Sequence, residues 1–185
     1  MNEFSIDIAD RQTCLVLDEP RLRDAVVRVL TEEHIQVATI SLTLVDDAEI
    51  HLVNREFLGH DYPTDVISFR LDEDGSQGLG ISDQKSGTRS QDVDGGDLGM
   101  SVPPSSTINP QLHLEGELIV STETALREAA AHGWSPHDEV LLYVVHGLLH
   151  LCGYDDLTDE ARPAMRVRER EVLAGWQLVP TGLEA

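Results

Sequence analysis

A pair of histidines near the end of the sequence is the clearest carrier of chemistry. His146 and His150 are four residues apart in the stretch HGLLHLCGYDD, residues 146–156. In a helix this spacing places both imidazoles on one face, where two ring nitrogens can share one metal ion. Gly153 permits a sharp turn at the helix end, which can bring Asp156 back as a third ligand. The sequence therefore predicts a metal site formed by His146, His150 and Asp156.

The types of these ligands favour zinc. Imidazole and carboxylate suit zinc, and three protein ligands leave a fourth position for water. Structural zinc sites are normally closed by four ligands, mostly thiolates, so an open site is typical of catalysis. The competing interpretation is two solvated histidines on a helix face. It is disfavoured because the helix is otherwise apolar and burying unpaired imidazoles is costly. We expect one zinc ion per chain, with another divalent metal as the alternative.

The same spacing occurs in the zinc motif of the metzincin proteases. In that motif a glutamate directly after the first histidine is the general base. The corresponding residue here is Gly147. Peptide hydrolysis by that mechanism is therefore disfavoured.

The elements that must position the histidines follow from the apolar periodicity. Their helix begins at the cap Ser135, has Pro136 at its first position and ends near Gly153. The pattern predicts four strands, within residues 4–8, 35–47, 65–71 and 114–121, and further helices over 19–30, 46–57, 122–131 and 159–174. We expect an α+β fold with residues 1–185 in a single domain. A four-stranded mixed sheet packs on about five helices, and the buried central helix carries the histidine pair.

Residues 72–112 differ in character from the rest of the chain. They are rich in Gly, Ser and Asp, contain seven acidic and two basic residues, and show no periodicity. This composition predicts a flexible acidic insertion, and a functional lid is the less favoured interpretation.

The charge of the whole chain restricts its partners. The 185 residues include 34 acidic and 13 basic ones, which gives a net charge of -21. Non-specific adhesion to nucleic acid is disfavoured because it requires Lys and Arg, whereas a local basic patch could still bind RNA specifically. The arginines at 162, 166, 168 and 170 alternate with glutamates, including Glu169, which favours an ordinary solvated face.

Location and redox state are also constrained. No stretch of about 18 apolar residues is present, and the first residues lack the pattern of a signal peptide. We expect a cytoplasmic protein without a membrane partner. The two cysteines, Cys14 and Cys152, do not form a disulfide framework, and Cys152 is expected to be a buried, inert thiol.

Three stretches together resemble the YbeY family of bacterial endoribonucleases. They are DYPTDVISF at residues 61–69, EGELIVS at 115–121 and HGLLHLCGYDD at 146–156, in the order of the family motifs. The resemblance implies a single-strand-specific, metal-dependent endoribonuclease that acts in 16S rRNA 3′-end maturation and ribosome quality control. It implies zinc on His146, His150 and Asp156. The implied partners are single-stranded RNA, 16S rRNA and the ribosome or ribosomal proteins, and no DNA.

Two departures from the family pattern concern ligands and phosphate contacts. Asp156 replaces the last motif histidine, which adds negative charge and shifts preference toward harder metals. The neighbouring Asp155 matches the motif's own aspartate, so a ligand shift by one position is the alternative. Leu58 stands where many members have an arginine, which is a candidate contact to RNA phosphate. Arg55 or Arg70 could make this contact instead.

The general base is not identified by the motifs. Asp65 and Glu117 lie in the family stretches and are the candidates, although either could instead orient a ligand histidine. Two other functions compete with the endoribonuclease. One is a non-catalytic ribosome-assembly or RNA-binding factor with a stabilising metal, and the other is a metallohydrolase that acts on another substrate.

Overall fold

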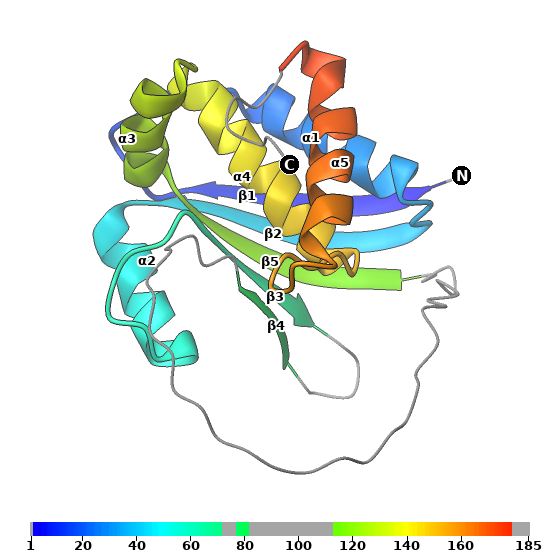
Figure 1. Ribbon diagram of the computed structural model, residues 1–185, viewed down its shortest axis with the longest axis horizontal. Coiled ribbons are helices and arrows are strands. Elements are labelled where there is room, and N and C mark those ends of the chain that lie inside the picture. Colours follow the sequence, from blue (N-terminus) through cyan, green and yellow to red (C-terminus); the bar gives the residue numbers. More distant parts are fainter. Residues whose placement is uncertain (1, 72–76, 82–112, 179–185) are drawn as a thin grey trace.

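A mixed β-sheet forms the centre of the fold (Figure 1). The computed structural model describes residues 2–71, 77–81 and 113–178. Its strands are β1 (Glu3–Asp10), β2 (Val37–Val45), β3 (Val66–Leu71), β4 (Gln77–Ile81) and β5 (His113–Ser121). Their order in the sheet is β1-β2-β5-β3-β4. The first three strands in this order are parallel, whereas β3 runs antiparallel to both β5 and β4.

The described sheet has five strands, one more than the sequence predicts. The additional strand, β4, lies inside the expected insertion 72–112 and pairs with β3, with Leu79 opposite Phe69. The strand is not predictable from its glycine-rich sequence, because β4 joins the sheet through main-chain hydrogen bonds, which do not require an alternating apolar pattern. The other residues of the expected insertion lie outside the described part of the chain.

The five predicted helices are present. They are α1 (Glu19–Glu32), α2 (Asp47–Val53), α3 (Thr122–His132), α4 (Pro136–Leu151) and α5 (Arg162–Leu173). A short π-helical segment, η1 (Asn54–Leu58), follows α2, and a short 3-10 helix, η2 (Ala174–Trp176), follows α5. Four of these helices begin where an Asp or Ser side chain accepts a hydrogen bond from the backbone three residues ahead, at Asp18, Asp46, Ser121 and Ser135. Within the described residues, no helix combines the length and apolar character needed to cross a bilayer.

The helices form layers on the two faces of the sheet. The helices α1, α3, α4 and α5 lie together on one face and bury the main core against the inward side chains of the strands (Figure 1). On the other face, α2 and η1 cover a smaller cluster that includes Ile50, Ile67 and Ile119. The alternating side chains of β5 therefore point into two different environments.

Helix α4 is buried along most of its length and lies unusually close to the sheet. Eleven of its 16 residues are buried. A Cβ atom at Gly147 would lie 2.6 Å from Leu118 Cδ2 and 3.0 Å from Val66 Cγ2. A glycine at this position therefore allows the close approach that fixes the helix, and with it His146, over β3 and β5.

Candidate metal centre

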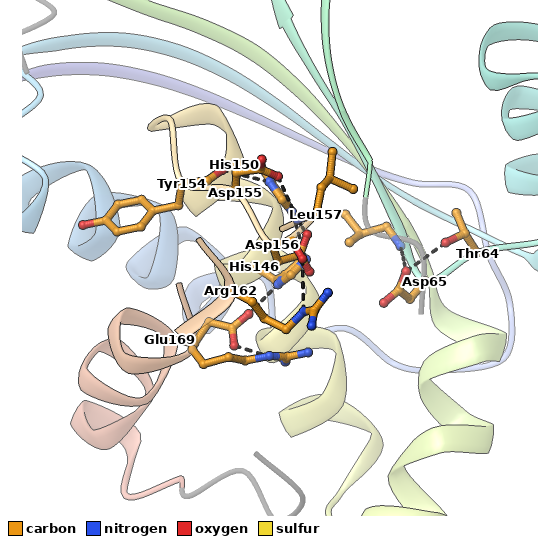
Figure 2. Close-up of polar contacts among 12 residues, drawn as sticks. Thr64, Asp65, His146, His150, Tyr154, Asp155, Asp156, Leu157, Arg162 and Glu169 are labelled. Carbon is orange, nitrogen blue, oxygen red and sulfur yellow. Dashed lines mark hydrogen bonds and ion pairs between the residues drawn. The ribbon is translucent and has the colours of Figure 1, made fainter. Parts of the chain in front are cut away.

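Three candidate ligands converge at the end of α4, as Figure 2 shows. The Nε2 atoms of His146 and His150 are 3.1 Å apart. The Asp156 carboxylate oxygens lie 3.6 Å from His150 Nε2 and 3.9 Å from His146 Nε2. Ligand atoms on a tetrahedral zinc ion at about 2.1 Å would be separated by about 3.4 Å. These three residues, the ligand cluster, could therefore hold a metal ion.

A glycine turn brings the third member of the cluster into place. Helix α4 ends at Leu151, and Gly153 has a φ of 99°, a left-handed conformation that favours glycine. The amides of Gly153 and Tyr154 bond back to the carbonyls of His150 (2.9 Å) and Leu149 (3.0 Å). This is the turn that the sequence predicts, and it directs the chain back across the open end of the helix.

The two histidines are oriented by hydrogen bonds at their outer nitrogens. His150 Nδ1 lies 3.0 Å from the carbonyl oxygen of Tyr154, and His146 Nδ1 contacts Glu169 Oε1. A carbonyl oxygen can only accept, so Nδ1 of His150 carries the hydrogen, and an ionised carboxylate requires the same of His146. When both rings are neutral, both Nε2 lone pairs then face the ligand cluster, as metal ligation requires.

Glu169 is the contact that sequence reasoning missed. The sequence places it on a solvated face of the last helix, but in the structure it is fully buried in α5. Arg166 lies 3.4 Å from its second carboxylate oxygen. The sequence does contain a pattern that indicates this burial. Met165, Glu169 and Val172 fall at i, i+4 and i+7, on the helix face that packs inward.

The charges around the cluster favour a cation. Burial lowers the pKa of His146, but the hydrogen bond and charge of Glu169, with the charges of Asp65 and Asp156, outweigh burial and raise it. Burial and the neighbouring His146 lower the pKa of His150. Protonation of one imidazole is thus favoured and of the other opposed. A metal ion placed between them would meet the same negative surroundings without requiring either ring to be protonated.

The two neighbouring aspartates have different environments. Asp156 is partly buried and joins the ligand cluster. Asp155 is exposed, and its Oδ1 accepts a hydrogen bond from the Leu157 amide at 3.1 Å. The main-chain oxygen of Asp156 accepts from Arg162 Nε at 3.1 Å, which ties the loop to α5. The geometry therefore places the carboxylate of Asp156, and not that of Asp155, beside the two histidines.

Asp65, one candidate general base, lies on the sheet side of the cluster (Figure 2). Its Oδ1 accepts hydrogen bonds from Thr64 Oγ1 (2.9 Å) and the Val66 amide (2.8 Å). Burial raises the pKa of Asp65, and the charge of nearby His146 only partly opposes this. The carboxyl is thus fixed in position near a candidate ligand and is a stronger base than an ordinary aspartate.

Glu117, the other candidate base, lies on the wrong face of the sheet. It falls between Gly116 and Leu118 of β5, and both of these face α4. Because side chains alternate along a strand, Glu117 points to the opposite face, away from the ligand cluster. The sequence could not show this, since the motif gives the position of Glu117 in the strand but not which face the helix covers.

The two arginines that could replace the missing family arginine at position 58 lie in different places. Arg70 on β3 donates to the Leu151 carbonyl at 3.3 Å, one residue beyond His150. Arg55 is exposed on η1, which packs against the other face of the sheet. Of the two, only Arg70 contacts α4, at the main chain next to His150.

Comparisons with known proteins agree on one family. The family model described as Endoribonuclease YbeY matches residues 7–177. A Rhodopirellula baltica protein named Endoribonuclease YbeY is 36% identical over 168 residues, covering 90% of this chain and 66% of that protein. A Geobacillus thermodenitrificans protein of the same name is 30% identical over 177 residues, covering 95% of this chain and 97% of that protein.

The fold agrees with a solved structure as well. The solution structure of a Thermotoga maritima protein aligns with a TM-score of 0.51 at 21% identity, over 93% of this chain and 91% of that one. At this identity the likeness concerns the fold alone. The match of the family model over most of the chain, together with these relatives, shows that the chain belongs to the YbeY family.

Proposed function

We propose that this protein is a metal-dependent endoribonuclease that cleaves single-stranded RNA, with the 3′ end of 16S rRNA as its target and a role in ribosome quality control. The observation that carries the proposal is the convergence of His146, His150 and Asp156 donor atoms within 4.8 Å of one another. Family membership supports the choice of RNA, because the matching relatives are named endoribonucleases. Association with ribosomes and a cytoplasmic location are part of the same proposal.

The ligand cluster is proposed to hold one zinc ion. Two imidazole nitrogens and a carboxylate fit zinc and leave a position for water. When bound, such an ion lowers the pKa of water and polarises a phosphodiester oxygen. Because Asp156 adds a negative charge, a harder ion such as Mn²⁺ is the alternative to zinc.

Asp65 is proposed to accept the proton of the attacking nucleophile. Its carboxyl is held by Thr64 and the Val66 amide and lies near His146. Burial raises the pKa of Asp65 toward the working pH, which strengthens it as a base. Arg70, beside the end of α4, is the proposed phosphate contact in place of the family arginine.

A peptidase is disfavoured for a structural reason as well as by sequence. The missing glutamate of the protease motif would stand at position 147, but this position faces β3 and β5 at a distance that no side chain fits. A general base at this position would be directed into the core and away from the ligand cluster. The non-catalytic ribosome-assembly or RNA-binding factor remains the second candidate, because the net charge of -21 and the leucine at position 58 both weaken contacts with an RNA substrate in the site.

The test combines metal analysis with cleavage of a single-stranded RNA oligonucleotide. Wild type is expected to contain about one equivalent of metal and to cleave, whereas His146→Ala loses both. His113→Ala, which changes a histidine whose side chain is 40% exposed on β5, is the matched control and should retain both. Stoichiometric metal without cleavage by wild type would support the binding factor instead. A wild type that holds no metal would refute the site.

A second pair of variants identifies the third ligand. Asp156→Ala should weaken metal binding by at least about 10- to 100-fold, the range for loss of a residue that only hydrogen-bonds to a metal ligand. Asp155→Ala should leave the affinity unchanged, since its carboxylate bonds to the Leu157 amide. Equal affinities of Asp156→Ala and wild type in calorimetric titration would exclude Asp156 as a ligand.

A further inference from the structure

Glu169 is a buried carboxylate whose surroundings are unlike those of a surface ion pair. Its side chain on α5 is fully buried, and it contacts Nδ1 of His146, 23 residues earlier on α4. In Figure 2 it lies below His146, on the side opposite to His150 and Asp156. A buried carboxylate is costly unless charged or hydrogen-bonded partners compensate it. Here the partners are the His146 ring and Arg166, one helical turn before Glu169.

We propose that Glu169 is a positioning residue that sets the metal affinity of the ligand cluster by holding His146 with Nε2 toward the ion. The inference rests on the metal site of the proposed function, but not on the RNA substrate. Glu169 itself is not a ligand, because its Oε1 faces Nδ1 on the far side of the ring. Its carboxylate keeps the hydrogen on Nδ1, which directs the Nε2 lone pair toward a metal ion in the cluster and makes that nitrogen more basic.

The two histidines differ in how they are oriented, which makes the inference testable. His150 is held by the main-chain carbonyl of Tyr154, which no side-chain substitution removes. His146 is held by a side chain, so its orientation can be changed alone. Glu169→Gln keeps an amide oxygen that can accept the Nδ1 hydrogen but removes the charge. Glu169→Ala removes the charge and the acceptor together.

The alternative role for Glu169 is purely structural, as a buried link between α4 and α5. Removing one partner of a buried charged pair destabilises a fold strongly, so loss of stability is expected under either role. Metal affinity separates the two. A structural link predicts lower stability of the metal-free protein with unchanged affinity in the folded fraction, whereas a positioning residue predicts weaker binding.

The experiment measures zinc affinity by competition with a chromogenic chelator in wild type, Glu169→Gln and Glu169→Ala. We expect about tenfold weaker binding for Glu169→Gln and up to about 100-fold for Glu169→Ala, the range for loss of a hydrogen-bond partner of a metal ligand. Glu171→Gln is the matched control. It removes a carboxylate charge from the same helix at a side chain that is 58% exposed, and the affinity should not change.

The second measurement is the ring ¹⁵N spectrum of His146 in the metal-free protein at a fixed pH, high enough for the ring to be neutral. Wild type should show the hydrogen on Nδ1, and Glu169→Gln should show a mixture of both tautomers. This measurement needs only the isosteric variant, so it holds even if Glu169→Ala does not fold. Unchanged zinc affinity together with an unchanged His146 spectrum in folded Glu169→Gln would overturn the inference. Metal binding without RNA cleavage by wild type would overturn the proposed function and leave the role of Glu169 intact.

Discussion

The close contact between α4 and the sheet at Gly147 gives the sharpest stability prediction. Gly147→Ala adds a methyl group that would start 2.6 Å from Leu118 Cδ2 and 3.0 Å from Val66 Cγ2. Leu118 is fully buried and Val66 is 2% exposed, so neither side chain has free space to move into. Val66 is also β-branched and stiff at χ1. The methyl group therefore pushes α4 away from the sheet and shifts His146, the adjacent residue.

Two opposing effects set the change that Gly147→Ala makes in the free energy of unfolding. Alanine is about 1 kcal/mol better than glycine inside a helix. Overpacking a core costs about 1–3 kcal/mol. Because both neighbours are confined, we expect a net loss of up to about 2 kcal/mol in the free energy of unfolding. For a protein of this length, each kcal/mol lowers Tm by about 2–4 °C.

A double-mutant cycle measured by chemical denaturation isolates this contact. Leu118→Ala alone should cost about 2–5 kcal/mol, because it leaves a cavity. In the Gly147→Ala background it should cost at least about 1 kcal/mol less, because the new methyl group enters that cavity. Leu114→Ala is the control, since Leu114 is buried on the same face of β5 but about 13 Å along the strand. Costs of Gly147→Ala and Leu118→Ala that add within about 0.5 kcal/mol would refute the reasoning.

Three further outcomes test the chemistry and electrostatics. Asp65→Asn should retain the bound metal but cleave RNA about 10²- to 10⁴-fold more slowly, the range for a lost general base; unchanged cleavage would remove Asp65 from that role. Burial raises the pKa of Asp47, but hydrogen bonds from two hydroxyl groups and Arg127 outweigh it and hold the pKa below 3.8. The stability gained from this ionised carboxylate is complete well above pH 3.8 and is lost as the pH falls through the lower folded value. The Tm deficit of Asp47→Asn should therefore shrink between pH 7 and pH 3, and a constant deficit would contradict the assignment. Cys14 is exposed, whereas burial raises the pKa of the Cys152 thiol to about 12, so mass spectrometry should find Cys14 alkylated long before Cys152.

The sequence by itself determined the features that depend on local spacing. The separation of four residues puts His146 and His150 on one face of a helix, and Gly153 permits the turn that follows. The helix starts at Ser135 and Asp46 were predictable because a capping side chain bonds within three residues of its own position. The predicted helices and four of the strands are present for the same reason, since amphipathic periodicity is written into neighbouring residues.

The tertiary structure decided what depends on residues far apart in the chain. Glu117 and Asp65 were equal candidates in sequence, but α4 packs on one face of β5, which separates Glu117 from the cluster and leaves Asp65 beside it. Glu169 resembles its exposed glutamate neighbours in sequence, yet the docking of α5 onto α4 buries it against His146. Asp155 and Asp156 are neighbours in sequence, but the path of one loop exposes Asp155 and directs Asp156 into the ligand cluster. Which face is covered, and which carboxylate is buried, is set by packing between distant elements, and no local pattern of residues encodes that contact.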